Sequence, residues 1–311
     1  MSLFFKSPID IEVRLDNEDS RQHVEVKNRK GRKEKLPLYE DGESVKGQVT
    51  IRLRNNNKLD HLGIKIQLIG TIETHSNSSS NNNASNSNNS NLTLNNNNDN
   101  FLYLLQELSA PATLNHPENY HFEFKNVEKQ FESYRGLNVN LRYYLKCIVL
   151  RKNSSNIIRE KELWVYNHQF PPDSPSSVKM DVGIEDCLHI EFEYSKSRYS
   201  LKDVIVGRIY FLLVRLKIKH MELSLIKRES IGTPPNQFSN SETLVRFEIM
   251  DGAPVRGEAI PIRLFLGGFD LTPTFRDVNK KFSVRTFLSL VLIDEDSRRY
   301  FKQSEIILYR E

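Results

Sequence analysis

The sequence YEDGESVKGQVTIRL at residues 39–53 recurs in pattern as YSLKDVIVGRIYFLL at residues 199–213. A tyrosine, a glycine and a series of aliphatic or aromatic residues stand at the same spacing in both segments. The matched pairs are Tyr39 with Tyr199, Val45 with Ile205, Gly47 with Gly207, Val49 with Ile209, Ile51 with Phe211, and Leu53 with Leu213. Apolar residues at every second position are typical of a β-strand with one face on a core. The two segments therefore predict one strand that occurs in two copies of a domain.

Two further segments recur in the same order. His61, Ile64 and Ile66 return as His220, Leu223 and Leu225, and the pattern at 141–149 returns at 284–292. The number of residues between a segment and its repeat is smaller for the last pair, because the first copy contains an extra stretch at 76–100. This stretch is of low complexity, and 20 of its 25 residues are Asn or Ser. Such a stretch has little apolar surface to bury, so we expect it to be disordered.

The chain is therefore expected to be all-β, with two tandem β-sandwich domains at 1–166 and 181–311. A length of 311 residues fits two domains. The segment between them, NHQFPPDSPSSVKM at 167–180, contains three prolines and is expected to be a semi-rigid linker. One short amphipathic helix is predicted in the first domain, from the helical spacing of Phe101, Leu104, Leu105 and Leu108.

Composition excludes several classes of protein. A net charge of +4 is too mild for a typical nucleic-acid binder. The longest apolar run, 209–214, is far shorter than the roughly 20 residues that a membrane helix needs. Both cysteines, Cys147 and Cys187, lie in strand-like segments and are expected to be free thiols in a reducing compartment.

No motif for catalysis stands out. There is no P-loop, dinucleotide-binding or nucleophile-elbow motif, and none of the eight histidines has metal-ligand spacing beside a carboxylate or thiol. We expect no enzyme activity, catalytic residue, metal site or cofactor. The remaining signal is at 245–252. Alternation there places Phe247 and Ile249 inward and Met250 outward, beside the turn at Asp251 and Gly252. An apolar residue on a polar face suggests a partner site.

Long stretches resemble the vacuolar protein sorting-associated protein 26 family, the arrestin-like subunit of retromer. They include VEKQFESYRGLNVNLRYYLK at 127–146 and DEDSRRYFKQSEIILYR at 294–310, together with 39–49, 104–111, 182–229 and 248–285. The resemblance covers nearly the whole chain except 76–100. It implies two arrestin-like sandwiches in a non-enzymatic subunit of the retromer coat. That coat retrieves transmembrane cargo from endosomes to the Golgi and the plasma membrane. The implied location is cytoplasmic and peripheral on endosomes, with indirect membrane association.

The resemblance also implies three binding sites. The large α-solenoid subunit would bind Ile249, Met250, Asp251 and Gly252. Cargo tails and sorting nexins would bind Arg298, Arg299, Tyr300 and Phe301, although alternation along 299–303 leaves open that Phe301 is a core residue. A sorting nexin with a PDZ domain would contact Asp41.

Two alternatives to a retromer subunit are another arrestin-like trafficking or signalling adaptor and a β-sandwich hydrolase or carbohydrate-binding module. Ubiquitin-ligase adaptors typically carry Pro-Pro-x-Tyr motifs, but Pro171 and Pro172 are followed by Asp173 and Ser174. A carbohydrate-binding module would need an exposed tryptophan, and the single tryptophan, Trp164, lies inside a predicted strand.

Overall fold

The computed structural model describes residues 7–27, 31–54, 58–74, 98–171 and 176–311. The chain divides into two compact units, Met1–Asn167 and His168–Glu311. Most of the predicted disordered stretch, 76–97, lies outside the described residues, whereas 98–100 belong to a strand. Within the predicted linker at 167–180, residues 178–180 open a strand whose alternate residues are buried.

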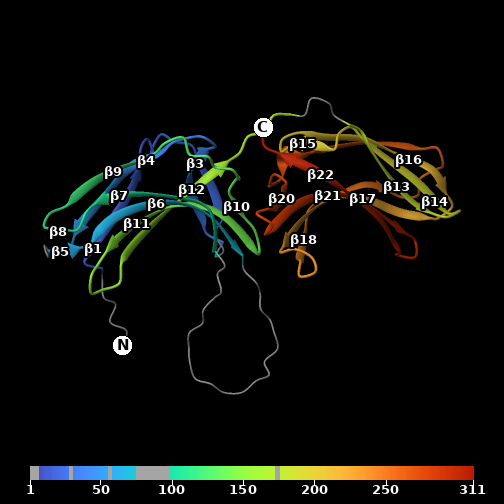
Figure 1. Ribbon diagram of the computed structural model, residues 1–311. Coiled ribbons are helices and arrows are strands. Elements are labelled where there is room, and N and C mark those ends of the chain that lie inside the picture. Colours follow the sequence, from blue (N-terminus) through green and yellow to red (C-terminus); the bar gives the residue numbers. More distant parts are fainter. Residues whose placement is uncertain (1–6, 28–30, 55–57, 75–97, 172–175) are drawn as a thin grey trace, which may run out of the picture. The chain divides into compact units, whose positions relative to one another are not determined.

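The first unit has two main sheets, drawn as curved layers in Figure 1. The smaller sheet is formed by β1 (Ile9–Leu15), β4 (Val45–Leu53) and β9 (Glu118–Phe124). The larger has the order β2 (His23–Lys27), β3 (Lys33–Glu40), β12 (Ile157–Tyr166), β11 (Val139–Leu150), β6 (Gly63–Thr74) and β7 (Asn98–Ser109). β10 (Tyr134–Arg135) pairs with β11, and β5 (Leu59–His61) pairs with β8 (Ala112–Leu114).

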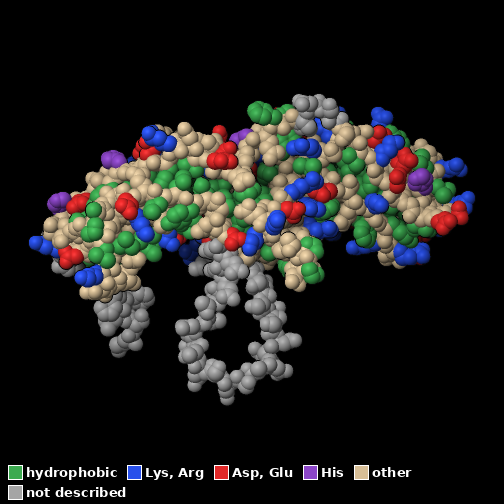
Figure 2. Space-filling model, in the orientation of Figure 1, with side chains coloured by type: hydrophobic (Ala, Val, Ile, Leu, Met, Phe, Trp, Pro, Cys, Tyr) green, Lys and Arg blue, Asp and Glu red, His purple; other side chains and the backbone are tan. Residues whose placement is uncertain are grey.

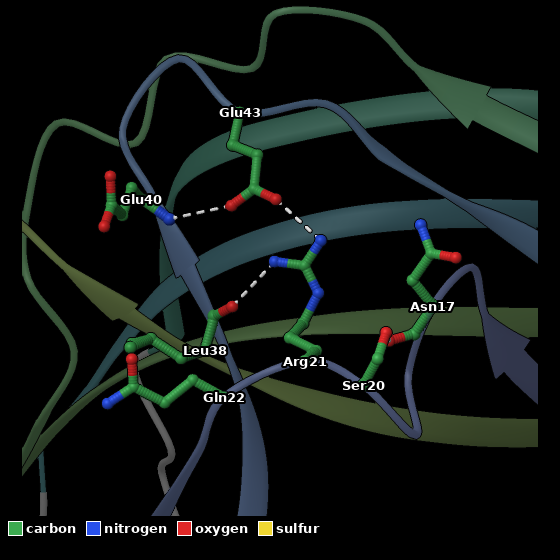
Figure 3. Close-up of a pocket in the computed structure, with 7 residues that line it drawn as sticks. All are labelled: Asn17, Ser20, Arg21, Gln22, Leu38, Glu40 and Glu43. Atoms are coloured by element: carbon green, nitrogen blue, oxygen red, sulfur yellow. Dashed lines mark hydrogen bonds and ion pairs between the residues drawn. The ribbon is translucent and has the colours of Figure 1, made fainter.

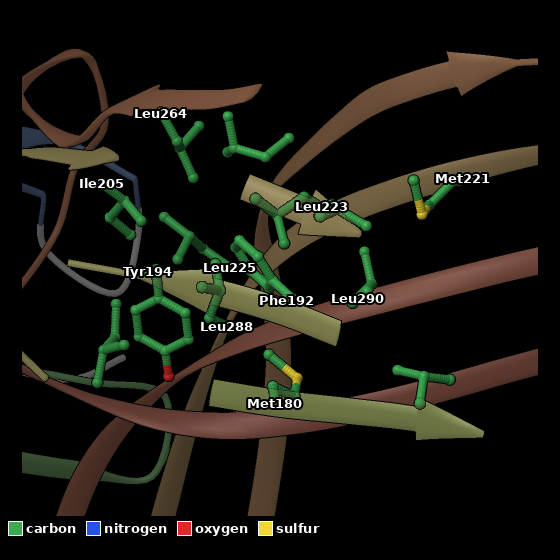
Figure 4. Close-up of a cluster of buried hydrophobic side chains, with 14 of the residues drawn as sticks. Met180, Phe192, Tyr194, Ile205, Met221, Leu223, Leu225, Leu264, Leu288 and Leu290 are labelled. Atoms are coloured by element: carbon green, nitrogen blue, oxygen red, sulfur yellow. The ribbon is translucent and has the colours of Figure 1, made fainter. Parts of the chain in front are cut away.

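The second unit also has two sheets, around a continuous apolar core. One sheet has the order β13 (Val178–Ile184), β14 (Leu188–Tyr194), β16 (Val204–Val214) and β19 (Ala259–Phe265). The other has the order β15 (Arg198–Ser200), β22 (Arg299–Tyr309), β21 (Phe282–Asp294), β17 (Ile218–Ile231) and β18 (Phe238–Asp251), with β20 (Phe275–Val278) on β21. Figure 4 shows Phe192 and Tyr194 of β14 among Leu223, Leu225 and Leu288 of the opposite sheet.

Strand order confirms the predicted duplication. β4 lies between β1 and β9, as β16 lies between β14 and β19. In the other sheet the order β3-β12-β11-β6-β7 is matched by β15-β22-β21-β17-β18. Each copy also has one parallel pair at the same place, β3 with β12 and β15 with β22. The strands at 39–53 and 199–213 therefore hold equivalent positions in one topology.

The glycine shared by the two copies has a steric cause. A Cβ atom on Gly47 would lie 2.2 Å from the carbonyl oxygen of Arg14, and one on Gly207 would lie 2.5 Å from that of Glu193. The neighbouring strand approaches so closely at both places that no side chain fits. Glycine therefore recurs because the same backbone contact recurs.

The predicted helix around 101–108 is wrong, because this segment is part of strand β7. β7 pairs with β6, placing Leu104 opposite Leu68 and Leu105 opposite Gln67. The Phe101 ring packs edge-on against Tyr143, with 5.3 Å between ring centroids, and covers Gly70, which has no side chain to block it. Pairing and packing outweigh the weak local preference for a helix.

The described residues hold a single helical element, the three-residue turn η1 (Leu266–Gly268), and the all-β prediction is confirmed. Among these residues, no helix is long and apolar enough to cross a membrane.

Candidate interaction surfaces

The turn between β3 and β4 is supported by a buried lysine. The Lys129 ammonium donates hydrogen bonds to the carbonyl oxygens of Glu40 at 2.9 Å, Glu43 at 2.5 Å and Val127 at 3.1 Å. Burial lowers the pKa of Lys129 to about 8, against the opposing effect of the Glu43 and Asp41 carboxylates. At neutral pH the group therefore remains charged and can donate to all three carbonyls.

Asp41 projects from this turn and is exposed. Its Oδ1 atom accepts hydrogen bonds from the backbone N–H groups of Gly42 at 2.9 Å and Lys129 at 2.6 Å. Asp41 therefore shapes the turn on which it stands, and a substitution there would change both the charge and the backbone.

A polar pocket of about 380 Å³ lies beside the same turn (Figure 3). Arg21 forms an ion pair with Glu43 at 2.6 Å, donates to the carbonyl oxygen of Leu38 at 2.8 Å, and stacks on Tyr39. The Ser20 hydroxyl donates to the backbone oxygen of Asn17 rather than to a base. The pocket therefore lacks the paired nucleophile and base of a hydrolase, and its charges hold the turn in place.

The end of β18 carries a β-bulge that the alternation did not predict. Glu248 pairs with Glu222, but the next pair joins Met250 to Met221, so Ile249 is an inserted residue. The insertion turns Met250 toward the buried Met221. The prediction that Met250 faces outward is therefore wrong. Ile249 and Met250 are both half-buried and pack against the core of the second unit.

The end of β18 has an exposed aromatic side chain and is followed by an exposed turn. Phe247, predicted inward, is 44% exposed, because β18 is the last strand of its sheet. The following turn is held by the Gly252 N–H, which donates to the Lys219 carbonyl oxygen at 2.7 Å. Gly252 has a φ of +110°, which favours glycine, and both Asp251 and Gly252 are exposed. The four residues at 249–252 thus form a partly covered apolar pair followed by an open turn.

The hairpin between β21 and β22 is organised by Asp294. Its carboxylate accepts hydrogen bonds from the Arg298 backbone N–H at 2.9 Å, the Arg298 Nε at 2.8 Å and the Tyr300 hydroxyl at 2.9 Å. Burial would raise the pKa of Asp294, but these hydrogen bonds outweigh it and hold the pKa below its usual value. Two of the four residues predicted here, Arg298 and Tyr300, therefore stabilise the hairpin.

The other two, Arg299 and Phe301, face outward. Phe301 is 64% exposed, so it is not a core residue. β22 pairs with β21 from Arg299 to Ile306, whereas β15 meets β22 only from Ile307 onward. In the part of the chain that the structure describes, no strand pairs with the other edge of β22 between residues 299 and 306. Phe301 thus lies on a strand with one open edge.

Charge is mixed over the face drawn in Figure 2, with basic and acidic side chains interspersed and apolar ones scattered between them. A nucleic-acid interface is expected to show a broad basic patch. This view shows no broad patch of one charge sign.

Comparison with known proteins gives full-length matches. The family model of vacuolar protein sorting-associated protein 26 matches residues 5–297. Vacuolar protein sorting-associated protein 26 of Schizosaccharomyces pombe is 55% identical over 310 residues, covering 100% of this chain and 98% of that protein. Vacuolar protein sorting-associated protein 26B of Homo sapiens is 50% identical over 313 residues, covering 100% and 88%. The Dictyostelium discoideum protein is 50% identical over 307 residues, covering 98% and 83%.

Proposed function

Because the chain belongs to the vacuolar protein sorting-associated protein 26 family, we propose that it is a non-enzymatic subunit of a retromer-type coat. Family membership gives it a role in vacuolar or endosomal protein sorting, and the relatives are named as sorting proteins rather than enzymes. The observation that carries the proposal is a match of 50–55% identity that runs through both units. Its place of action would be the cytosolic face of endosomes, where the coat retrieves transmembrane cargo for the Golgi and the plasma membrane.

The test is affinity purification of the tagged full chain from cell lysate. We expect a large helical-repeat subunit to co-purify in stoichiometric amount, because a coat subunit works within a stable assembly. A signalling or ubiquitin-ligase adaptor would instead bring down receptors or a ligase. Repeated purification without any helical-repeat protein would contradict the proposal.

The end of β18 is the proposed contact for that subunit, through Ile249, Met250, Asp251 and Gly252. A half-buried apolar pair on an edge strand, next to an exposed turn, supports this assignment. Apolar anchors surrounded by polar residues carry much of the affinity at protein interfaces. Asp41, exposed on its turn in the first unit, is the proposed contact for a sorting nexin with a PDZ domain.

The open edge of β22 is the proposed place for a cargo tail, with Arg298, Arg299, Tyr300 and Phe301 around it and a sorting nexin closing the groove. An extended peptide can add to a free strand edge through backbone hydrogen bonds, which any sequence can make. Specificity must then come from side-chain contacts. Phe301 is exposed between Tyr300 and Lys302, and it suits contact with an apolar cargo residue.

Phe301→Ala should lower the affinity for a hydrophobic cargo-tail peptide at least tenfold when the sorting nexin is present. The alanine removes apolar contact area while leaving the backbone edge intact, so weak binding should remain. Isothermal titration calorimetry measures the affinity. Phe238→Ala is the matched control, because Phe238 is 60% exposed at the far end of β18 and should not affect the peptide. A fall in melting temperature together with loss of the helical-repeat subunit would show that Phe301 acts through folding, against the assignment.

A further inference from the structure

The outer face of the sheet β13-β14-β16-β19 brings together a histidine and two carboxylates. Asp181 lies on β13, and His189 and Glu191 lie two residues apart on β14. Their neighbours Val182 and Ile190 are buried in the core, so these three side chains point to the opposite face. One nitrogen of His189 and one oxygen from each carboxylate all lie within 4.8 Å of one another.

Strand register makes this cluster electrostatically unusual. Asp181 is directly opposite Glu191, and like charges directly opposite each other in an antiparallel pair are destabilising. Among the described residues, neither carboxylate forms an ion pair with a lysine or arginine, and the His189 Nε2 lies 4.0 Å from an Asp181 oxygen. The arrangement therefore places two carboxylates beside an imidazole, with no lysine or arginine paired to either of them in the described part of the chain.

The position opposite His189 is also open. Gly183 pairs with His189, so β13 places no side chain next to the imidazole ring. The ring can therefore lean toward the carboxylate pair without meeting a neighbour on that strand.

We propose that Asp181, His189 and Glu191 bind a zinc ion. Zinc takes imidazole nitrogen and carboxylate oxygen at about 2.0–2.2 Å, usually as a tetrahedron, which implies donor atoms about 3.3 Å apart. The present spacing needs a closure of about 1.5 Å, within reach of side-chain rotations because Asp181 and His189 are exposed and Glu191 is half-exposed. A fourth position remains for water or a group from a partner. Calcium and magnesium prefer all-oxygen sites with more ligands, so the imidazole favours zinc.

Zinc at this place would join β13 to β14. Among the strands that the structure describes, β13 is the edge strand of its sheet and pairs only with β14. A dication between Asp181 and Glu191 would replace their repulsion with attraction. Binding should therefore stabilise the second unit as well as occupy the three ligands.

Zinc titration of the full chain, measured by competition with a chromophoric chelator and by thermal unfolding, tests the site. We expect one zinc per chain and a rise in the melting temperature of the unmodified protein. His189→Ala, Asp181→Asn and Glu191→Gln should each weaken zinc binding at least tenfold and abolish that rise. Without zinc, Asp181→Asn and Glu191→Gln should melt no lower than the unmodified chain, because each removes one of two facing charges.

Two control variants separate this site from general surface binding. His116→Ala removes an exposed histidine that stands beside a single carboxylate, Glu118, at 3.9 Å. Glu193→Gln removes the next acidic side chain along the same strand. Both should bind zinc as the unmodified chain does. The proposal fails if zinc does not bind stoichiometrically, if the three variants bind as before, or if calcium binds equally tightly with and without His189.

Discussion

Replacing Gly47 or Gly207 by alanine should destabilise the unit that contains it by about 3 kcal/mol or more. Overpacking typically costs 1–3 kcal/mol when flexible side chains can adjust. Here the new Cβ would lie 2.2 or 2.5 Å from a backbone oxygen of the adjacent strand, so the strands themselves must separate. Such a loss lowers the melting temperature by roughly 6–12 °C in a unit of this size.

Calorimetry of the full chain measures this effect, because two compact units can give separate transitions. Gly47→Ala should shift only the first unit's transition and Gly207→Ala only the second's. Gly268→Ala is the matched control, since a Cβ atom there meets nothing within 4 Å and its φ is not in the left-handed region. If both alanine variants melt within 1–2 °C of the unmodified chain, the shared glycine is not explained by close approach.

The duplication could be predicted because its signal lies in the alternation of buried residues. A shift of one residue would turn every side chain of a strand to the wrong face. The order of apolar residues in 39–53 and 199–213 is therefore tightly constrained in both copies, and the common topology follows from it.

The strand at 98–109 could not be predicted with the same rule. Leu104 and Leu108 lie on one face of a helix and also on one face of a strand, so their spacing fits both. The deciding contacts are distant in sequence: pairing with β6 and the Phe101 ring over Gly70. Neither is visible from local spacing.

The candidate sites were likewise predictable where they depend on neighbouring residues and not where they depend on strand pairing. The residues at 249–252 and 298–301 are contiguous in sequence, but the inserted Ile249 reverses the face of Met250, and only the pairing with β17 reveals that insertion. His189 and Glu191 of the proposed zinc site share a face at i and i+2 on a strand. The third member, Asp181, joins them only through strand register. The role of Lys129 could not be predicted from the sequence, because its three carbonyl partners are backbone atoms.

Replacing Ile249 by aspartate together with Met250 by asparagine should reduce the affinity for the helical-repeat subunit at least thirtyfold. A central apolar anchor contributes about 2 kcal/mol or more at an interface. A charge placed in a desolvated contact adds a further penalty. Pull-down and calorimetry with the purified helical-repeat subunit measure the loss.

The double variant needs a control for stability. Ile249 and Met250 also pack against the core of the second unit, so the double variant will lower the stability of that unit. Leu244 is half-buried on the same strand, packs against the same core and lies away from the turn, which makes Leu244→Asp the matched control. It should lower the melting temperature by a comparable amount and leave partner affinity unchanged.

If Leu244→Asp weakens binding as much as the double variant does, the loss reflects folding of the second unit, and 249–252 is not the contact. If the double variant binds normally while folded by circular dichroism, the helical-repeat subunit must contact another surface. Only loss of binding confined to the double variant supports an anchor formed by the bulge, where one inserted residue places two apolar side chains beside an exposed turn.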